Sequence, residues 1–174
     1  MNAHRNLIIF RLACCCGLRG SEIADLQVGD VVLDVERPHL RLRRGATKGG
    51  KARCVPLWWD SGTLADLRAW KRRRDAGPTA PFVCSVQRHS DGERLQRHAI
   101  RRRFLSACKV LGPERLRTLT IHHGRHTFIS HALAGGRPLA EVRAAAGHSN
   151  VAVTSVYLHV VVDEREVVGE LFGA

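Results

Sequence analysis

The chain has 174 residues, of which 44% are hydrophobic, which suits one soluble domain with an ordinary core and excludes a disordered chain. Its 28 lysines and arginines outnumber 16 acidic residues, so the net charge is +12 and a polyanion is the expected partner. None of the six cysteines forms a C-x-x-C pair, which argues against a zinc knuckle or a redox motif and favours a reducing cytoplasm.

The N-terminal segment predicts two helices. Residues 5–16 are rich in apolar side chains and stop at Gly17, and Ser21 is the expected N-cap of a short helix that runs to about Leu26. Arg11 interrupts the apolar stretch, and no run reaches the roughly 20 apolar residues of a membrane span. We therefore expect a cytoplasmic protein with no membrane partner.

A β-hairpin follows. Residues 39–44 and 51–56 alternate in character on both sides of a glycine-rich tip at 45–50, which is typical of two paired strands. A short strand near Val31–Val35 would complete a three-stranded antiparallel sheet.

Two further helices are expected in the middle of the chain. Leu64, Leu67 and Trp70 recur at helical spacing, and the basic run KRRR suits the negative end of that helix. A second helix is predicted over 96–111. Its expected buried face consists of Ile100, Phe104, Ala107, Cys108 and Leu111.

Positive charge is concentrated between Arg88 and Arg117. This segment holds nine basic and three acidic residues, a surplus of six that is half of the net charge of the chain. The segment could be a solvated helix face, but the high total charge favours the lining of a groove for nucleic acid.

The C-terminal part predicts four more helices separated by glycine and proline. Their expected positions are from about 124 to Gly135–Gly136, from Pro138 to Gly147, a short helix capped by Ser149 or Asn150, and 163–171. The predicted fold class is therefore α+β, mostly helical, with one small antiparallel sheet.

The sequence IHHGRHT at 121–127 raises the possibility of a metal site. His122 and His126 lie four residues apart, as zinc-binding histidines do on a helix. That motif needs a glutamate after the first histidine, where this chain has His123, and no third ligand stands out. The pattern disfavours a metal, and we expect none.

A phosphate site accounts for more of the sequence. Cleaving a phosphodiester without a metal requires positive groups on the non-bridging oxygens, where charge builds up in the transition state. Arg125 supplies one guanidinium, and Arg19, in the turn GLRGSE, supplies a second. Glu22 lies three residues after Arg19 and can hold that guanidinium and the next helical turn in register.

The remaining chemical groups are a proton donor and a nucleophile. Lys48, at the predicted hairpin tip, can protonate the leaving oxygen, with Lys51 as the less favoured alternative. His122 and His148 can donate hydrogen bonds to the same phosphate. Tyr157 is the only tyrosine, and a phenol that attacks phosphorus would store the bond energy for resealing.

The motifs GLRGSEIADL, TKGGKARCVPL, HHGRHTFISHALAGG and AGHSNVAVTSVYLHV occur in this order. In content and order they resemble the catalytic domain of the tyrosine recombinases, the phage-integrase family, over nearly the whole chain. The resemblance places the catalytic residues of the family on Arg19, Lys48, His122, Arg125, His148 and Tyr157.

The resemblance implies a mechanism, a fold and partners. The fold would be that of the tyrosine-recombinase catalytic domain. Four protomers would bind two double-stranded DNA sites, cleave them through 3′-phosphotyrosine without metal or ATP, and exchange strands through a Holliday junction. The enzyme would work at the nucleoid. The C-terminal segment 163–174 resembles the helix that docks into a neighbouring protomer, although its apolar stripe could equally pack on its own core.

Two departures from the family pattern bear on whether this chain cleaves DNA. Relatives carry an N-terminal DNA-clamping domain, whereas residues 1–174 read as catalytic domain alone, so the chain is expected to be a piece or a minimal form. Gly124 replaces a bulky apolar residue, which should loosen the helix start. A DNA-binding remnant that no longer cleaves is the leading alternative, and a metal-dependent hydrolase is a weaker one.

The other histidines of the cluster have structural expectations. His126 is expected to be buried and hydrogen-bonded, and His123 to face solvent or the DNA backbone.

Overall fold

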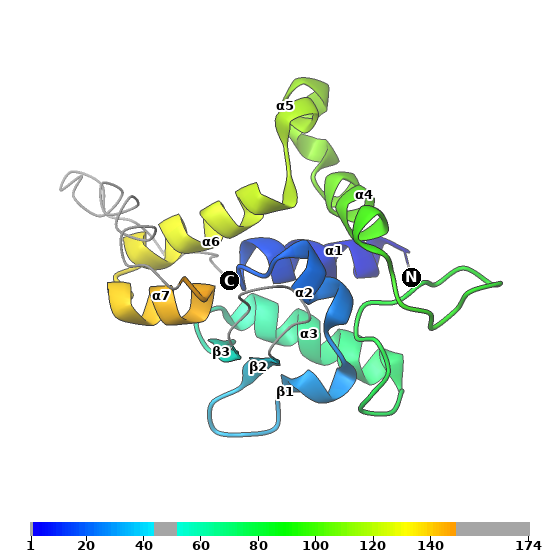
Figure 1. The fold of residues 1–174 in the computed structure, drawn as a ribbon, viewed down its shortest axis with the longest axis horizontal. Coiled ribbons are helices and arrows are strands. Elements are labelled where there is room, and N and C mark those ends of the chain that lie inside the picture. The colour runs from blue at the N-terminus through cyan, green and yellow to red at the C-terminus, as the bar shows by residue number, and fades with distance from the viewer. Residues whose placement is uncertain (1, 44–51, 149–174) are drawn as a thin grey trace.

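A computed structural model describes residues 2–43 and 52–148 (Figure 1). These residues are mostly helical, with one three-stranded antiparallel sheet, which confirms the predicted fold class. In chain order the elements are α1 (Asn2–Cys14), α2 (Gly20–Asp25), the 3-10 turn η1 (Val28–Asp30), β1 (Val31–Val32), β2 (His39–Leu42), β3 (Arg53–Pro56), α3 (Ser61–Arg74), α4 (Arg97–Ala107), the 3-10 turn η2 (Lys109–Leu111), α5 (Gly112–Thr118), α6 (Ile121–Ala134) and α7 (Leu139–Ala146).

Helix α1 is the centre of the core. It contacts α2, α3, α4 and α6, and it crosses the middle of the molecule in Figure 1. Ile8, Ile9 and Leu12 are completely buried in these contacts. Arg11, which interrupts the apolar run in the sequence, lies at the edge of the core and donates to Asp66 (2.9 Å). A charge at the edge of this helix is therefore compatible with a buried apolar face.

Helix α2 begins two residues earlier than expected. Arg19 occupies the N-cap position in an extended conformation, so the predicted cap at Ser21 is wrong. The carboxylate of Glu22 accepts the backbone N–H of Arg19 (2.7 Å), which satisfies a donor that the helix itself leaves unpaired. Glu22, a residue of the first turn, therefore caps the helix in place of the serine that the sequence suggested.

The predicted sheet is confirmed. β1 pairs with β2, and β2 pairs with β3 in the register His39↔Pro56 to Leu42↔Arg53. Leu40 and Val55 face each other in this register and are both fully buried. The hairpin tip, with Lys48 and Lys51, lies outside the described residues.

The helix expected over 96–111 is wrong at its C-terminal end. α4 stops at Ala107, the chain passes through the 3-10 turn η2, and a separate helix α5 follows. The chain turns again between η2 and α5, where Gly112 has φ +80° and Pro113, which has no N–H to donate, lies in the first turn of α5. Leu111, expected on the buried face, is 51% exposed, and Val110 is 91% exposed. α4, η2 and α5 form an arm that projects from the body (Figure 1).

The two helices after this arm lie side by side. α6 begins at Ile121, three residues before the expected start, because Nδ1 of His123 accepts the backbone N–H of Thr120 (3.0 Å). Pro138 precedes α7, which ends at Gly147 with φ +68°, both as predicted. The expected helices around Tyr157 and over 163–171 lie outside the described residues.

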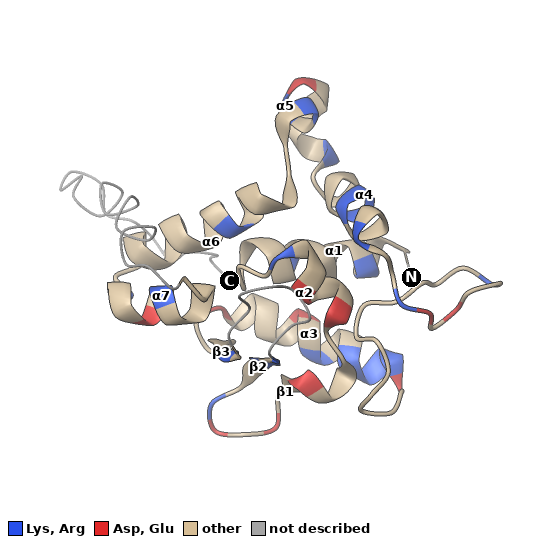
Figure 2. Ribbon diagram, in the orientation of Figure 1, with Lys and Arg blue, Asp and Glu red and all other residues tan. Residues whose placement is uncertain are grey.

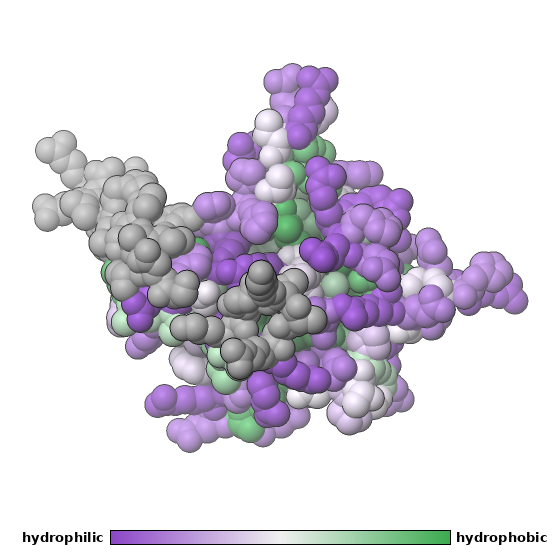
Figure 3. Space-filling model, in the orientation of Figure 1, coloured by the Kyte–Doolittle hydropathy of each residue, from purple (hydrophilic) through white to green (hydrophobic). Residues whose placement is uncertain are grey.

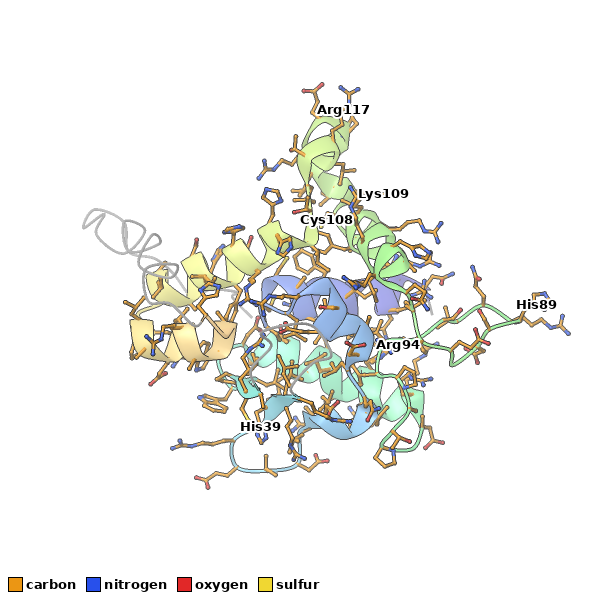
Figure 4. All side chains as sticks on the ribbon, in the orientation of Figure 1. His39, His89, Arg94, Cys108, Lys109 and Arg117 are labelled. Carbon is orange, nitrogen blue, oxygen red and sulfur yellow. The ribbon has the colours of Figure 1, made fainter. Side chains whose placement is uncertain are left out.

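Surface charge follows the predicted concentration. Lysine and arginine gather on α4 and at the end of α3 (Figure 2), and hydrophilic surface covers the projecting arm and the loop before α4 (Figure 3). Lys109 and Arg117 lie along the arm, and His89 and Arg94 lie on that loop (Figure 4). Within residues 2–43 and 52–148, no helix is long and apolar enough to cross a membrane.

Candidate active site

The first guanidinium of the site belongs to Arg19, at the N-terminus of α2. Its Nη1 donates to Oε1 of Glu22 (3.2 Å), while its backbone N–H donates to the other oxygen of the same carboxylate. The side chain remains 38% exposed, so the guanidinium reaches the surface. Glu22 therefore fixes both the backbone and the side chain of Arg19, as the spacing in the sequence suggested.

Glu22 is itself held from the sheet. Arg53 of β3 donates from Nη1 to Oε1 (2.7 Å) and from Nη2 to Oε2 (3.0 Å), the two-pronged geometry in which guanidinium–carboxylate pairs are strongest. Burial alone would raise the pKa of Glu22, but the hydrogen bonds and charge of Arg53, together with Arg19, lower it below its ordinary value. The carboxylate is therefore ionised at neutral pH.

The second guanidinium of the predicted pair, Arg125, is buried in α6. Its Nη1 donates to the carbonyl of Gly17 (2.9 Å), two residues before Arg19, and its Nη2 donates to the carbonyl of Ala146, two residues before His148. The side chain thus ties α6 to the segment that carries Arg19 and to the end of α7. These contacts set the relative positions of three of the predicted site residues.

His148 follows the C-terminal turn of α7 and is half-buried. The N–H of Gly147 donates to the carbonyl of Ala144 (3.1 Å), and the N–H of His148 donates to that of Arg143 (3.2 Å), the paired bonds that end many helices at a glycine. α7 contacts β3, and Gly147 of this turn lies against Arg53 of that strand.

Positive groups from α6, β3 and the start of α2 surround His148. Burial, and after it the charges of Arg125, Arg19, Arg53 and His126, together lower the pKa of His148 to about 4. The imidazole is therefore neutral at pH 7 and retains one ring N–H to donate. Positive charge that suppresses a proton in this way also favours a bound anion.

The histidine cluster is arranged differently from the expectation. His122 is exposed on the first turn of α6. Burial lowers the pKa of His126, and the charges of His123, His122 and Arg125 lower it further. His126 is exposed, so the expectation of a buried histidine is wrong. His123 is half-buried and caps the helix through Thr120, which corrects the expectation that it faces solvent or DNA.

Two predicted residues, Lys48 and Tyr157, lie outside the described residues. Among the residues that the structure describes, it brings together Arg19, Glu22, Arg125 and His148. Their arrangement suits an anion with several oxygens, because two guanidinium groups and a neutral imidazole all present N–H donors. Residues 2–43 and 52–148 contain no group of three histidine, cysteine or acidic side chains placed to hold a metal ion.

Arg53 was not singled out in the sequence. A signal for it exists, because residues 53 and 55 project to the same side of a strand and Val55 is a core residue. An arginine on the core side of a strand needs a carboxylate partner, and Glu22 supplies it.

Comparison with known proteins identifies this architecture. The sequence profile of the phage integrase family matches residues 1–164. The chain belongs to the phage integrase family. Among members of this family it is 34% identical over 154 residues to the tyrosine recombinase XerC of Chromobacterium violaceum, covering 88% of this chain and 47% of the relative. It is 28% identical over 156 residues to XerA of Pyrococcus furiosus, covering 90% and 50% of the two chains.

Solved structures of recombinases share the fold. The crystal structure of XerA recombinase aligns with a TM-score of 0.69 at 24% identity and covers 90% of this chain and 53% of its own. XerH bound to a palindromic difH substrate, in a post-cleavage complex, aligns with a TM-score of 0.67 at 22% identity, covering 90% and 42%. This integrase-family chain spans about half the length of the curated relatives that it matches.

Proposed function

We propose that this chain is the catalytic part of a site-specific recombinase that cleaves and rejoins double-stranded DNA through a 3′-phosphotyrosine intermediate. The observation that carries the proposal is the placement of Arg19, Arg125 and His148 around one site in a chain of the phage integrase family. Because catalysis of phosphoryl transfer depends on charge stabilisation, this arrangement is the one that the reaction requires.

Each proposed site residue has one role in the reaction. Arg19 and Arg125 bind the non-bridging oxygens of the scissile phosphate, and His148 donates a hydrogen bond to it. The hydroxyl of Tyr157 loses its proton to water as its oxygen attacks phosphorus, the bond to the 5′ oxygen breaks, and Lys48 supplies the proton that the leaving 5′-hydroxyl takes up. A new phosphodiester, on tyrosine, replaces the old one, so the reverse reaction reseals DNA without an external energy source.

His122 is the exposed member of the proposed set. It lies on the first turn of α6, three residues before Arg125 and therefore on the same side of the helix, where its exposed ring can approach a bound phosphate. We assign it a hydrogen bond to the bound phosphate.

The proposed partners are double-stranded DNA and further copies of this chain. XerH was solved bound to its difH substrate and the Tn1549 integrase in complex with circular intermediate DNA, which supports DNA as the partner here. We assign a tetramer on two DNA sites, with segment 163–174 docking between protomers, at the nucleoid. The net charge of +12 suits that location.

The test is covalent capture. A pool of short duplexes, randomised around a single nick, lets a small fragment diffuse away after cleavage and traps the protein on DNA. The parent chain should form a covalent DNA adduct at low salt that resists denaturant, and Tyr157→Phe should form none.

Three outcomes separate this proposal from its alternatives. DNA that is retarded by the parent chain but never linked to it contradicts cleavage and favours a DNA-binding remnant. Cleavage that stops when a chelator is added favours a metal-dependent hydrolase. Adduct formation that persists in the chelator supports the recombinase.

A further inference from the structure

Arg53 is the most deeply buried charged group of the site that has no assigned role. Its side chain is only 8% exposed, and all three of its guanidinium nitrogens donate hydrogen bonds. Two of the bonds go to Glu22, and the third runs from Nε to the carbonyl of Ala145 (2.8 Å). This one side chain therefore joins β3 to α2 and to the last turn of α7.

Both contacts of Arg53, with Glu22 and with Ala145, are close to residues that would bind the phosphate. On one side, the carboxylate of Glu22 holds the backbone and the guanidinium of Arg19. On the other side, Ala145 lies three residues before His148 along the same turn.

The turn itself is shaped to receive Arg53. A Cβ added to Gly147 would lie 2.9 Å from Cδ and 2.9 Å from Nε of Arg53, closer than real contacts allow. The guanidinium therefore packs against bare backbone at the residue that precedes His148. A close approach of this kind restricts the direction in which the chain leaves α7.

A role in stability alone explains this arrangement poorly. Buried ion pairs contribute little net stability, because the cost of removing both charges from water offsets their attraction. What such a pair does provide is a fixed geometry, and here the geometry relates two residues that lie 129 positions apart in the sequence.

We propose that Arg53 is a positioning residue that sets Arg19 and His148 on the same phosphate. This inference rests on the proposed strand-cleavage function, because it assigns the purpose of the positioning. Arg53 acts through Glu22 and through the turn at Gly147, and it does not itself bind the reacting atoms.

The positive charge of Arg53 can be tested independently of the reaction rate, through the pKa of His148. Burial has the largest effect in lowering the pKa of His148, and the groups that face the ring add to it: Arg125 and His126 from α6, Arg19 before α2, and Arg53 from β3. Removing the positive charge of Arg53 should raise the pKa of His148 from about 4 toward its ordinary value. This shift would show that the two side chains lie close together in solution, and the rate of adduct formation tests whether Arg53 positions the ring.

The experiment compares four proteins: the parent chain, Arg53→Met, Arg53→Lys and Arg41→Met. Arg41 is the matched control, because it lies exposed on the neighbouring strand β2 and pairs with Cys54. For each protein we would measure the single-turnover rate of adduct formation at saturating nicked-duplex pool, the affinity for the same pool, and the pKa of His148 by NMR of labelled imidazoles.

Arg53→Met should slow adduct formation by about 100-fold, the effect of a small displacement of catalytic groups, and change the DNA affinity by only a few-fold. The pKa of His148 should rise. Arg53→Lys keeps the charge but cannot bond both Glu22 and Ala145, so the pKa should stay near that of the parent while the rate remains at least about 10-fold low. Arg41→Met should match the parent in all three measurements.

The inference is overturned if folded Arg53→Met or Arg53→Lys forms the adduct at the rate of the parent. Should Arg53→Met fail to fold, Arg53→Lys decides, because it retains the charge opposite Glu22. A parent chain that forms no adduct would refute the proposed function instead. In that case the pKa of His148 tests Arg53 by itself. The positioning role is overturned if a folded Arg53→Met leaves the pKa of His148 unchanged and DNA shifts that pKa by the same amount as in the parent.

Discussion

At the scale of single residues, the end of α7 combines two demands on one glycine. Gly147 adopts φ +68°, which side chains rarely tolerate, and it also lies against the guanidinium of Arg53. Gly136 has a similar φ of +77° but has open space where a side chain would project. The two positions separate the cost of backbone strain from the cost of the contact.

We therefore expect Gly147→Ala to destabilise the protein more than Gly136→Ala does. Backbone strain should cost each variant about 1 to 2 kcal/mol. The crowding against Arg53 should add at least about 1 kcal/mol at Gly147 alone. Urea denaturation of the two variants measures the difference, and equal free energies of unfolding would show that Arg53 moves aside freely.

The sequence proposed the residues of the candidate site but not all of the contacts that hold them. Short sequence motifs were enough to propose four residues, namely Arg19, Glu22, Arg125 and His148, because each motif lies within a few consecutive positions. The burial of Arg53 could be inferred from its position beside Val55 on the strand, but its role could not, because that role depends on contacts with α2 and α7 that are distant in the sequence. The burial of His126 was wrongly predicted for the same reason, since a local pattern does not reveal which side of α6 faces the core.

At the scale of elements, the packing of α6 on α1 explains Gly124. The sequence suggested that this glycine loosens the start of the helix. In the structure a Cβ at this position would lie 3.0 Å from Cβ of Ala13 and 3.1 Å from Sγ of Cys14, and α1 is the central helix of the core. Glycine here permits a close approach of the two helices, which keeps the buried Arg125 within reach of Gly17.

Substitutions at Gly124 test this packing. Alanine gains about 1 kcal/mol in helix propensity but meets a crowding cost of about 1 to 3 kcal/mol, so Gly124→Ala should be mildly destabilising. Gly124→Leu should lose about 3 kcal/mol or more. Free energies of unfolding from urea titration provide the measurement.

A double-mutant cycle with Ala13→Gly supplies the control. Because that change removes the nearest atom on α1, Gly124→Ala should cost at least about 0.5 kcal/mol less in its presence. A stabilising effect of Gly124→Ala in the parent chain would contradict the close-packing explanation.

Element boundaries were predictable where the sequence contains a clear signal. Gly147 and Pro138 bounded α7 as expected, because each residue acts through its own backbone. The helix predicted over 96–111 extends too far, because Leu111 fits the spacing of its apolar face and yet is 51% exposed. Periodicity alone does not distinguish a buried stripe from apolar residues on a projecting arm.

At the scale of the whole molecule, the arrangement of charge predicts how DNA is bound. Arg97, Arg101 and Arg102 are exposed on α4, within the basic segment 88–117 that the sequence assigned to a nucleic-acid groove. Binding that neutralises phosphates releases counterions, so the affinity should fall steeply as the salt concentration rises.

Replacing Arg97, Arg101 and Arg102 together by glutamine should weaken binding to duplex DNA at low salt. The slope of log affinity against log salt should also become shallower, by roughly 0.9 for each phosphate contact that is lost. Fluorescence anisotropy over a series of salt concentrations measures both quantities, with circular dichroism as the control for folding. An unchanged slope would place the α4 arginines outside the DNA-binding surface.

The most direct measurement of the central proposal is to locate the covalent bond between protein and DNA. The adduct formed with the nicked duplex pool would be digested with protease and nuclease and analysed by mass spectrometry. We expect a nucleotide joined through its 3′ phosphate to the peptide that contains Tyr157, and no such peptide from Tyr157→Phe. A nucleotide on any other residue, or cleaved DNA without a covalent bond to the protein, would contradict a site built from Arg19, Arg125 and His148 to direct Tyr157 at one phosphate.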